Sequence, residues 1–453
     1  MFRNPMRICL LAFLLLVCLL SLVAADEQHI IADVKAFFET QNVTRQAELV
    51  RRIKADPAYR RARVGEYLHR APLFDDLEPG HKRIDVALSE SRKLPVTLRI
   101  PKGYSPSRPY PLLYVLHCSG CDAQWSIRFG ERLLRDKVDK YVIAAPAGYG
   151  PQDFYPCETS AILRTIKKSV HIDSDRVWVT GYSAGGCSSW ALAVLQPDEF
   201  TAAIPVAGSL YIGPQTPAFL ANMAHTYVLN VWGAKDNLPG WDADKVGIAE
   251  SNRQLRAEVQ RLGLPVDSHE YPNLGHGGVM PPRELLMPAL KRRREHHPQQ
   301  VHHTFQHPCQ AKAYWLERNM KQGELASRRP APLDQRPGEN VNRAIERALD
   351  SQRGVLRGVI EEQTIRIDAK NAEEITVWIG DGMIDWQKPV RVLMDDHEVF
   401  NDTIEPDLSV CLTQAARTRD FDRLRWAGLI VRAAAPAELV TGATTVQETP
   451  DED

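Results

Sequence analysis

Ser183 lies in a sequence pattern that can expose a serine hydroxyl for nucleophilic chemistry. The pattern is G-Y-S-A-G at 181–185, which matches G-x-S-x-G. A run of β-branched and aromatic residues, V-W-V-T at 177–180, precedes it, and a small-residue segment that can form a helix, 186–195, follows. Strand, turn and helix in this order are typical of a nucleophile elbow, whose strained turn leaves the serine exposed at the end of a sheet. The alternative, a glycine–serine surface turn, is disfavoured by the flanking strand and helix patterns.

A serine hydroxyl is a weak nucleophile near neutral pH, so it needs a base and a carboxylate that orients the base. Asp236 follows the apolar run 227–232, which predicts a carboxylate just beyond the carboxyl end of a strand. His276 lies between glycines in a predicted loop that can bring its ring to the serine. The order serine, aspartate, histidine matches that of hydrolases with a nucleophile elbow. Asp242 and Asp244 are nearby alternatives for the carboxylate.

Such chemistry also needs backbone N–H groups that bind the oxyanion of the tetrahedral intermediate. The apolar run 111–116 predicts a strand buried on both faces, and it ends in H-C-S-G-C at 117–121. We expect the oxyanion donors to be the amides of Ser119 and Ala184. Cys118 stands where hydrolases of this class usually carry glycine, which places the local conformation of this loop in question.

Together these motifs resemble the esterase-type α/β-hydrolases, over about residues 83–297. The most similar groups are dienelactone hydrolase-like, prolyl-oligopeptidase-like, and secreted feruloyl and polyhydroxybutyrate esterase-like proteins. The layout is similar to that of planctomycete-type hydrolases with a small β domain after the catalytic unit, and its clearest trace is W-Q-K-P-V-R-V at 386–392 followed by E-V-F-N at 398–401. The resemblance implies hydrolysis of a carboxylic ester through an acyl-enzyme by a Ser183–His276–Asp236 triad, without a metal or organic cofactor.

Strand and helix patterns alternate through the middle of the chain, which predicts an α/β fold with a mainly parallel sheet. The first two strands, at 84–88 and 95–100, are expected to form an antiparallel edge. An N-terminal helical segment and a small C-terminal β-rich sandwich flank this unit. The predicted organisation is a signal peptide (1–25), a helical segment (26–75), an α/β-hydrolase catalytic domain (80–300), a connector (301–355), a β-rich accessory domain (356–435) and a disordered acidic tail (436–453).

The N-terminus predicts export. Arg3 and Arg7 are followed by an almost wholly apolar run, 8–23, and by Ala24 and Ala25. This is the pattern of a secretory signal peptide, so we expect a secreted or periplasmic protein without a membrane partner after cleavage. A retained anchor is the alternative. The formal net charge of -1 argues against nucleic-acid binding. The expected partner is a small-molecule or polysaccharide-linked ester, and the oligomeric state is left open.

The cysteine content fits an oxidising compartment. Six cysteines follow the predicted leader, an even number. We predict a disulfide from Cys118 or Cys121 to Cys157. A metal at the C-x-x-C spacing of 118–121 is disfavoured because no second cysteine pair lies at zinc-site distance. The basic run 291–294 is interpreted as the solvated end of a helix.

Two other functions compete with an esterase. A serine peptidase of the prolyl-oligopeptidase type is disfavoured because the sequence shows no propeller repeats. A catalytically inactive hydrolase fold that binds polysaccharide or a cell surface could use Trp378 and Trp386 for stacking, although buried core tryptophans are favoured. Candidate pocket residues are Trp241, Tyr182 and Phe154.

Overall fold

The computed structural model describes residues 27–89, 92–147, 156–210, 216–238, 246–305, 310–319, 335–339, 344, 347, 353–433 and 435–440. The predicted signal peptide lies outside these residues, as does residue 441 onward of the predicted acidic tail. The tail prediction is wrong at its start, because residues 436–439 belong to strand β18 (Ala435–Leu439). Within the described ranges, no helix is both long and apolar enough to span a membrane.

Within the described residues, the larger sheet has eight strands. In spatial order they are β1 (Gly80–Ala87), β2 (Lys93–Ile100), β4 (Val142–Pro146), β3 (Tyr110–Leu116), β5 (Ile172–Tyr182), β6 (Ala202–Val206), β7 (Tyr227–Gly233) and β8 (Val266–Tyr271). β2 is antiparallel to β1 and β4, and the other neighbouring pairs are parallel. This arrangement is that of the α/β-hydrolase fold, so the predicted fold class is confirmed.

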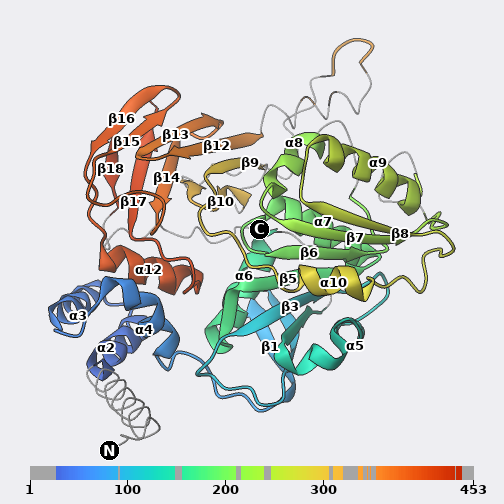
Figure 1. Ribbon diagram of the computed structural model, residues 1–453, viewed down its shortest axis with the longest axis horizontal. Coiled ribbons are helices and arrows are strands. Elements are labelled where there is room, and N and C mark those ends of the chain that lie inside the picture. The colour runs from blue at the N-terminus through green and yellow to red at the C-terminus, as the bar shows by residue number, and fades with distance from the viewer. Residues whose placement is uncertain are drawn as a thin grey trace, which may run out of the picture.

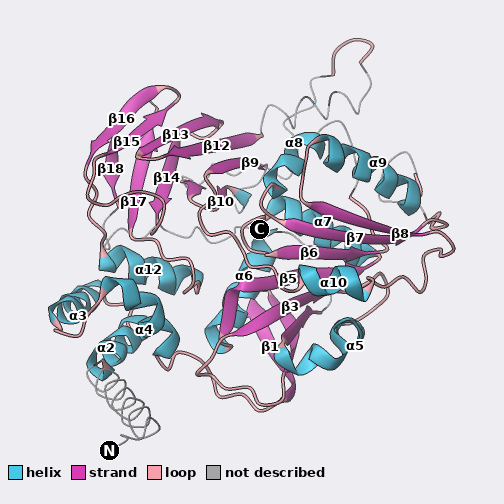
Figure 2. Cartoon of the chain, viewed as in Figure 1, coloured by secondary structure: helices cyan, strands magenta, loops and turns pink. Residues whose placement is uncertain are grey.

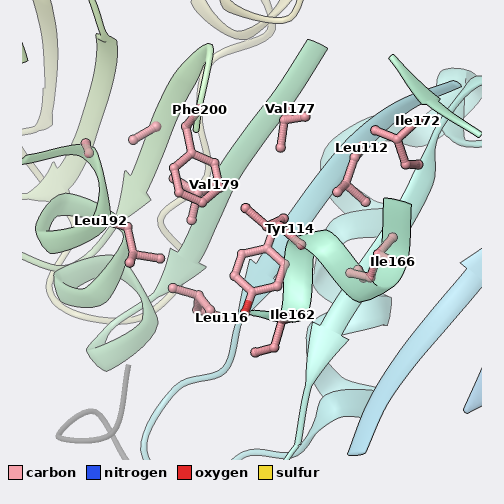
Figure 3. Packing of buried hydrophobic residues seen from close by; sticks show 14 of the residues in the cluster. Leu112, Tyr114, Leu116, Ile162, Ile166, Ile172, Val177, Val179, Leu192 and Phe200 are labelled. Carbon is pink, nitrogen blue, oxygen red and sulfur yellow. The ribbon is translucent and has the colours of Figure 1, made fainter. Parts of the chain in front are cut away.

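Helices cover both faces of this sheet (Figure 1). They are α5 (Ala123–Leu134), η2 (Arg135–Lys140), α6 (Pro156–Ser169), α7 (Ala184–Leu195), α8 (Thr216–Leu220), η3 (Ala221–Met223), α9 (Ile248–Arg261) and α10 (Arg283–Ala289). Leu112, Tyr114 and Leu116 of β3 pack in the layer formed with α6, α7 and α9 (Figure 3), and Leu113 and Val115 pack in the layer formed with α5 and α10. Because successive strand side chains alternate between faces, an uninterrupted apolar run is needed to bury both.

The C-terminal part forms two β-sheets (Figure 2). Each has five strands within the described residues, and the two share one apolar core. One sheet runs β10 (Lys312–Ala313), β11 (Leu316–Arg318), β14 (Glu374–Ile379), β17 (Ala427–Arg432) and β18 (Ala435–Leu439). The other runs β16 (His397–Asp402), β15 (Val390–Met394), β13 (Thr364–Lys370), β12 (Gly354–Glu361) and β9 (Gln300–Phe305). The segment expected to be a connector therefore carries most of β9 and all of β10 and β11. These strands are short or rich in histidine, so their apolar alternation is weak in the sequence.

The N-terminal helices pack against the C-terminal part of the chain. They are α2 (Gln28–Glu39), α3 (Val43–Ala55), η1 (Arg61–Arg63) and α4 (Val64–Arg70), and they lie beside α12 (Leu408–Thr418) (Figure 1). Leu49 and Ile53 of α3 share a buried cluster with Leu408 and Leu412 of α12. One apolar core thus holds the N-terminal helices against α12.

A buried ion cluster joins the larger sheet to the segment after α12. The Arg294 guanidinium, whose side chain is 2% exposed, lies 3.2 Å from an Asp175 carboxylate oxygen and 2.9 Å from an Asp420 oxygen. The interpretation of 291–294 as a solvated helix end is therefore wrong for Arg294. The helix α10 ends at Ala289, earlier than expected, and the chain then turns inward so that Arg294 meets these carboxylates.

Candidate active site

Ser183 occupies the turn between β5 and α7 in a strained conformation. Its backbone has φ 58° and ψ −118°, in the positive-φ range that non-glycine residues rarely adopt. The Ser183 amide donates to the Val206 oxygen at 2.9 Å, and the Ser183 oxygen accepts from the Cys187 amide at 2.9 Å. Tertiary and helical hydrogen bonds therefore hold the strained residue in place, as expected of a nucleophile elbow.

The glycines of this turn are required by close backbone contacts. A Cβ at Gly181 would lie 2.4 Å from the main chain of Gly185, and one at Gly185 would lie 2.2 Å from the Leu116 oxygen. A Cβ at Gly186 would lie 2.6 Å from the Val206 oxygen. The elbow thus packs directly on the ends of β3 and β6, which fixes Ser183 at the carboxyl edge of the sheet.

The structure brings Ser183, His276 and Asp236 into one hydrogen-bonded relay. His276 Nε2 lies 2.9 Å from Ser183 Oγ, and His276 Nδ1 lies 2.7 Å from Asp236 Oδ2. A carboxylate only accepts hydrogen bonds, so Nδ1 carries the proton and Nε2 is left to accept the serine hydroxyl proton. The Asp236 side chain is fully buried, whereas that of His276 is one quarter exposed. The relay therefore has the geometry of a nucleophile, a base and an orienting carboxylate.

The turn after β7 holds Asp236 in this position. The Asp236 amide donates to the Gly233 oxygen at 3.1 Å, and its carboxylate accepts from the Leu238 amide at 3.3 Å. A Cβ at Gly233 would lie 2.2 Å from the Gly275 oxygen, so the carboxylate turn and the histidine loop are in backbone contact. The alternative carboxylates, Asp242 and Asp244, lie outside the described residues.

Tyr182 orients the histidine loop from the residue before Ser183. Its hydroxyl donates to the main-chain oxygen of His276, and its ring meets the imidazole edge-on at a centroid distance of 5.7 Å. Trp125 and Phe129 of α5 pack around the same ring. Burial raises the pKa of the Tyr182 phenol, which keeps the donor proton in place. The sequence indicated Tyr182 only as a pocket candidate, because nothing local in the sequence shows that its hydroxyl reaches a loop 94 residues away.

The loop after β3 begins at the elbow. A Cβ at Gly185 would also lie 2.9 Å from the His117 oxygen, so the start of the loop touches α7. The predicted oxyanion donors are at Ser119, exposed in this loop, and Ala184, the first residue of α7. Helix α7 leaves its first amides without intrahelical acceptors, which makes its N-terminus an electropositive site.

The disulfide prediction is wrong in its partner. Cys118 and Cys121 are bonded to each other, with 5.2 Å between their Cα atoms, rather than to Cys157. The Cys157 side chain is not among those that the structure describes. The four-residue turn itself brings the two cysteines together, because the Cys121 amide donates to the Cys118 oxygen at 3.0 Å. Cys187 carries a free thiol whose pKa is raised by burial.

Three carboxylates, those of Asp173, Asp175 and Asp422, place their oxygens within 4.8 Å of one another. Each is already paired with a basic side chain: Asp173 with Arg176 at 2.5 Å, Asp175 with Arg294 at 3.2 Å, and Asp422 with His69 at 3.1 Å. These carboxylates thus already have guanidinium or imidazole partners, as in a structural ion network.

Four other aromatic candidates remain, of which the structure describes only Trp378 and Trp386. Trp241 and Phe154 lie outside the described residues. Trp378 is 1% exposed, and its indole N–H donates to Glu317 at 2.6 Å. Trp386 is half-buried, and the Arg61 guanidinium lies over its ring at 5.4 Å. Trp378 is therefore a core residue, and the exposed face of Trp386 is partly taken by Arg61.

Residues 89–276 match the model of a protein family described as "Putative esterase". This match covers the elbow, the carboxylate turn and the histidine, and it is less than half of the chain. It agrees with the strand order in indicating an esterase-type α/β-hydrolase. No curated protein shows significant sequence similarity to the chain.

Solved structures with a similar fold share little sequence with the chain. A thermostable esterase is 20% identical, over 47% of this chain and 63% of its own length, with a TM-score of 0.35. The feruloyl esterase module from Clostridium thermocellum, complexed with sinapinate, is 14% identical, over 44% and 84%, with a TM-score of 0.33. The acylaminoacyl peptidase of Pyrococcus horikoshii is 15% identical, over 44% and 38%, with a TM-score of 0.34. The chain thus spans less than two thirds of the thermostable esterase, and similarity this distant carries no argument about substrate.

Proposed function

We propose that the protein is an exported serine hydrolase that cleaves carboxylic esters through an acyl-enzyme. The observation that carries this proposal is the relay from Ser183 Oγ through His276 to the buried Asp236, with distances of 2.9 and 2.7 Å. The family match over residues 89–276 supports the coarser conclusion of an esterase or related hydrolase.

The reaction begins with proton transfer from Ser183 Oγ to His276 Nε2 as the oxygen attacks the ester carbonyl carbon. The amides of Ser119 and Ala184 donate to the resulting oxyanion, and Asp236 stabilises the imidazolium. When the tetrahedral intermediate collapses, His276 returns the proton to the leaving alkoxide and the acyl group stays on Ser183. Water, deprotonated by His276, then attacks the acyl carbonyl and releases the carboxylic acid. No step requires a metal or an organic cofactor.

An ester is favoured over a peptide as substrate. Peptidases of the prolyl-oligopeptidase type restrict access with a propeller, and the described residues outside the larger sheet form short sheets and helices instead. A small-molecule or polysaccharide-linked ester remains the proposed partner, with a secreted or periplasmic location.

Turnover of aryl acetate and butyrate esters by the purified protein, compared with an anilide of the same acyl group, tests this proposal. We expect ester hydrolysis to exceed anilide hydrolysis by a large factor. Equal or faster anilide cleavage would favour a peptidase, and no turnover of either would favour a binding protein.

A further inference from the structure

The loop that carries the proposed oxyanion donor is short and largely exposed. Ser119 and Gly120 are exposed, and Cys118 and Cys121 are half-buried. On one side the loop is attached to the buried end of β3 at Leu116, and on the other to α5, whose N-cap Asp122 accepts from the Trp125 amide at 2.7 Å. The Ser119 amide therefore lies in a short exposed span between two fixed elements.

The covalent bond within this span closes it into a ring. Cys118 and Cys121 form a disulfide, and the Cys121 amide donates to the Cys118 oxygen at 3.0 Å. His117 Nδ1 lies 3.0 Å from the same oxygen. Gly120 has φ 74°, a left-handed conformation that allows the chain to reverse within the ring. The disulfide, the turn hydrogen bond and the His117 contact thus all include Cys118 or Cys121.

The ring is also adjacent to the nucleophile. Gly185, two residues after Ser183, leaves no room for a Cβ because the Leu116 and His117 oxygens lie 2.2 and 2.9 Å from where it would be. Cys118 follows His117 directly. The peptides of Cys118 and Ser119 are therefore oriented relative to Ser183 in two ways: by the backbone contact of Leu116 and His117 with Gly185, and by the disulfide.

We propose that the Cys118–Cys121 disulfide is a positioning element of the active site. It holds the Ser119 amide toward the oxyanion, so the rate of ester hydrolysis depends on whether this pair is oxidised. The inference rests on the proposed function and extends it to regulation of the same site. Because oxyanion donors act on the transition state, loss of the ring lowers kcat and leaves KM nearly unchanged.

The test uses the full-length mature protein and a phosphine reductant. Reduction adds two electrons and two protons to the sulfur–sulfur bond to give two thiols, and the phosphine becomes its oxide with oxygen from water. We expect kcat for an aryl ester to fall by roughly tenfold or more, with KM within about threefold, and to return on re-oxidation. The thermal midpoint should change little, since the span contributes no core side chain. Mass spectrometry after alkylation shows whether both thiols are exposed.

Two variants test whether the loss of kcat on reduction comes from the Cys118–Cys121 disulfide. In Cys118→Ser/Cys121→Ser, kcat should already be low and the reductant should have no further effect. Cys157→Ser/Cys309→Ser removes two cysteines whose side chains lie outside the described residues, and it should remain as sensitive as the wild type. If the first variant does not fold, the wild-type reduction and re-oxidation decide alone.

Three results would overturn the proposal: unchanged kcat when both thiols are shown to be reduced, continued sensitivity of the Cys118→Ser/Cys121→Ser variant, or loss of sensitivity in the Cys157→Ser/Cys309→Ser variant. Absence of turnover in the oxidised wild type is a different result, because it contradicts the proposed function itself.

Discussion

Tyr182 donates a hydrogen bond from its phenol to the main-chain oxygen of His276, which ties the residue before the proposed nucleophile to the loop of the proposed base. The same backbone turn that presents Ser183 therefore also orients the imidazole. The histidine loop is thus held both by this bond and by the close approach of Gly275 to Gly233.

Tyr182→Phe should slow catalysis without affecting substrate binding. The change removes one hydrogen bond of about 1 kcal/mol and leaves the ring packing intact. We expect kcat for an aryl ester to fall by roughly fivefold, while KM stays within about twofold. Tyr314→Phe is the matched control, because the Tyr314 hydroxyl also donates to a main-chain oxygen, that of Pro197, far from the relay. An equal loss of kcat in both variants would contradict the positioning role of Tyr182.

Asp236→Asn should reduce kcat by roughly 10⁴-fold and leave the fold intact. The amide can donate to Nδ1, which places the imidazole proton on Nε2 and removes the base from Ser183. Asp85→Asn, on the exposed edge strand β1, is the control and should retain full activity. If Asp236→Asn retained most of its activity, another carboxylate, such as Asp242 or Asp244, would be the orienting group.

Gly233→Ala should destabilise the protein, since its Cβ would lie 2.2 Å from one backbone oxygen and 2.5 Å from another. We expect a loss of about 1–3 kcal/mol in the free energy of unfolding and a lower kcat, because the clash pushes the Asp236 turn away from the His276 loop. Gly277→Ala, in the His276 loop, is the control, because no heavy atom lies within 4 Å of its new Cβ. Its free energy of unfolding should stay within about 0.5 kcal/mol of the wild-type value. Denaturant unfolding of the two variants makes the comparison, and a Gly233→Ala variant as stable as Gly277→Ala would contradict the contact.

Glu317 should make the stability of the protein depend on acid pH. Burial acts to raise the pKa of this carboxyl, but the charges of Arg417 and Arg425 and the hydrogen bond from Arg417 at 2.8 Å hold it well below its usual range. A group whose pKa is lower in the folded than in the unfolded state stabilises the fold above the unfolded value, about 4.3, and this contribution is lost as the pH falls toward the folded value.

Glu317→Gln should therefore lower the free energy of unfolding at pH 7 by about 3–5 kcal/mol, because the buried Arg425 and the partly buried Arg417 lose their carboxylate partner. Its stability should also decline less steeply than that of the wild type between pH 4.5 and pH 2. Glu398→Gln, an exposed partner of Arg391, is the control and should follow the wild-type curve closely. Parallel pH curves for Glu317→Gln and the wild type would be inconsistent with the lowered pKa.

Local chemistry explains which parts of the molecule the sequence could predict. The elbow, the Asp236 turn and the His276 loop each have glycines at positions where the backbone approaches another segment. Because these glycines are part of the local motif, the motif itself predicts each of the three turns. The inner strands β3, β4, β6 and β7 of the larger sheet are apolar runs between helical patterns, and this arrangement predicts a parallel sheet.

Long-range pairings were not predictable from the sequence. Nothing near Arg294 indicates that it meets Asp175 and Asp420, and nothing near Leu49 indicates that it packs on Leu408. The disulfide prediction relied on joining neighbouring segments, whereas the turn after β3 brings Cys118 and Cys121 together locally. Strands as short as β10 and β11 carry too few residues to show a period and pair only because β14 offers a partner edge.

The most direct test of the account is labelling with a fluorophosphonate probe, which requires a serine activated by a base. The mature wild-type protein and a Ser183→Ala variant would be treated in parallel, with aryl ester turnover measured on the same samples. The account predicts that the wild type is labelled on Ser183 and hydrolyses the ester, and that the folded variant does neither. Labelling at another residue, or an Ser183→Ala variant that still turns over the ester, would contradict the assignment of Ser183 as the nucleophile.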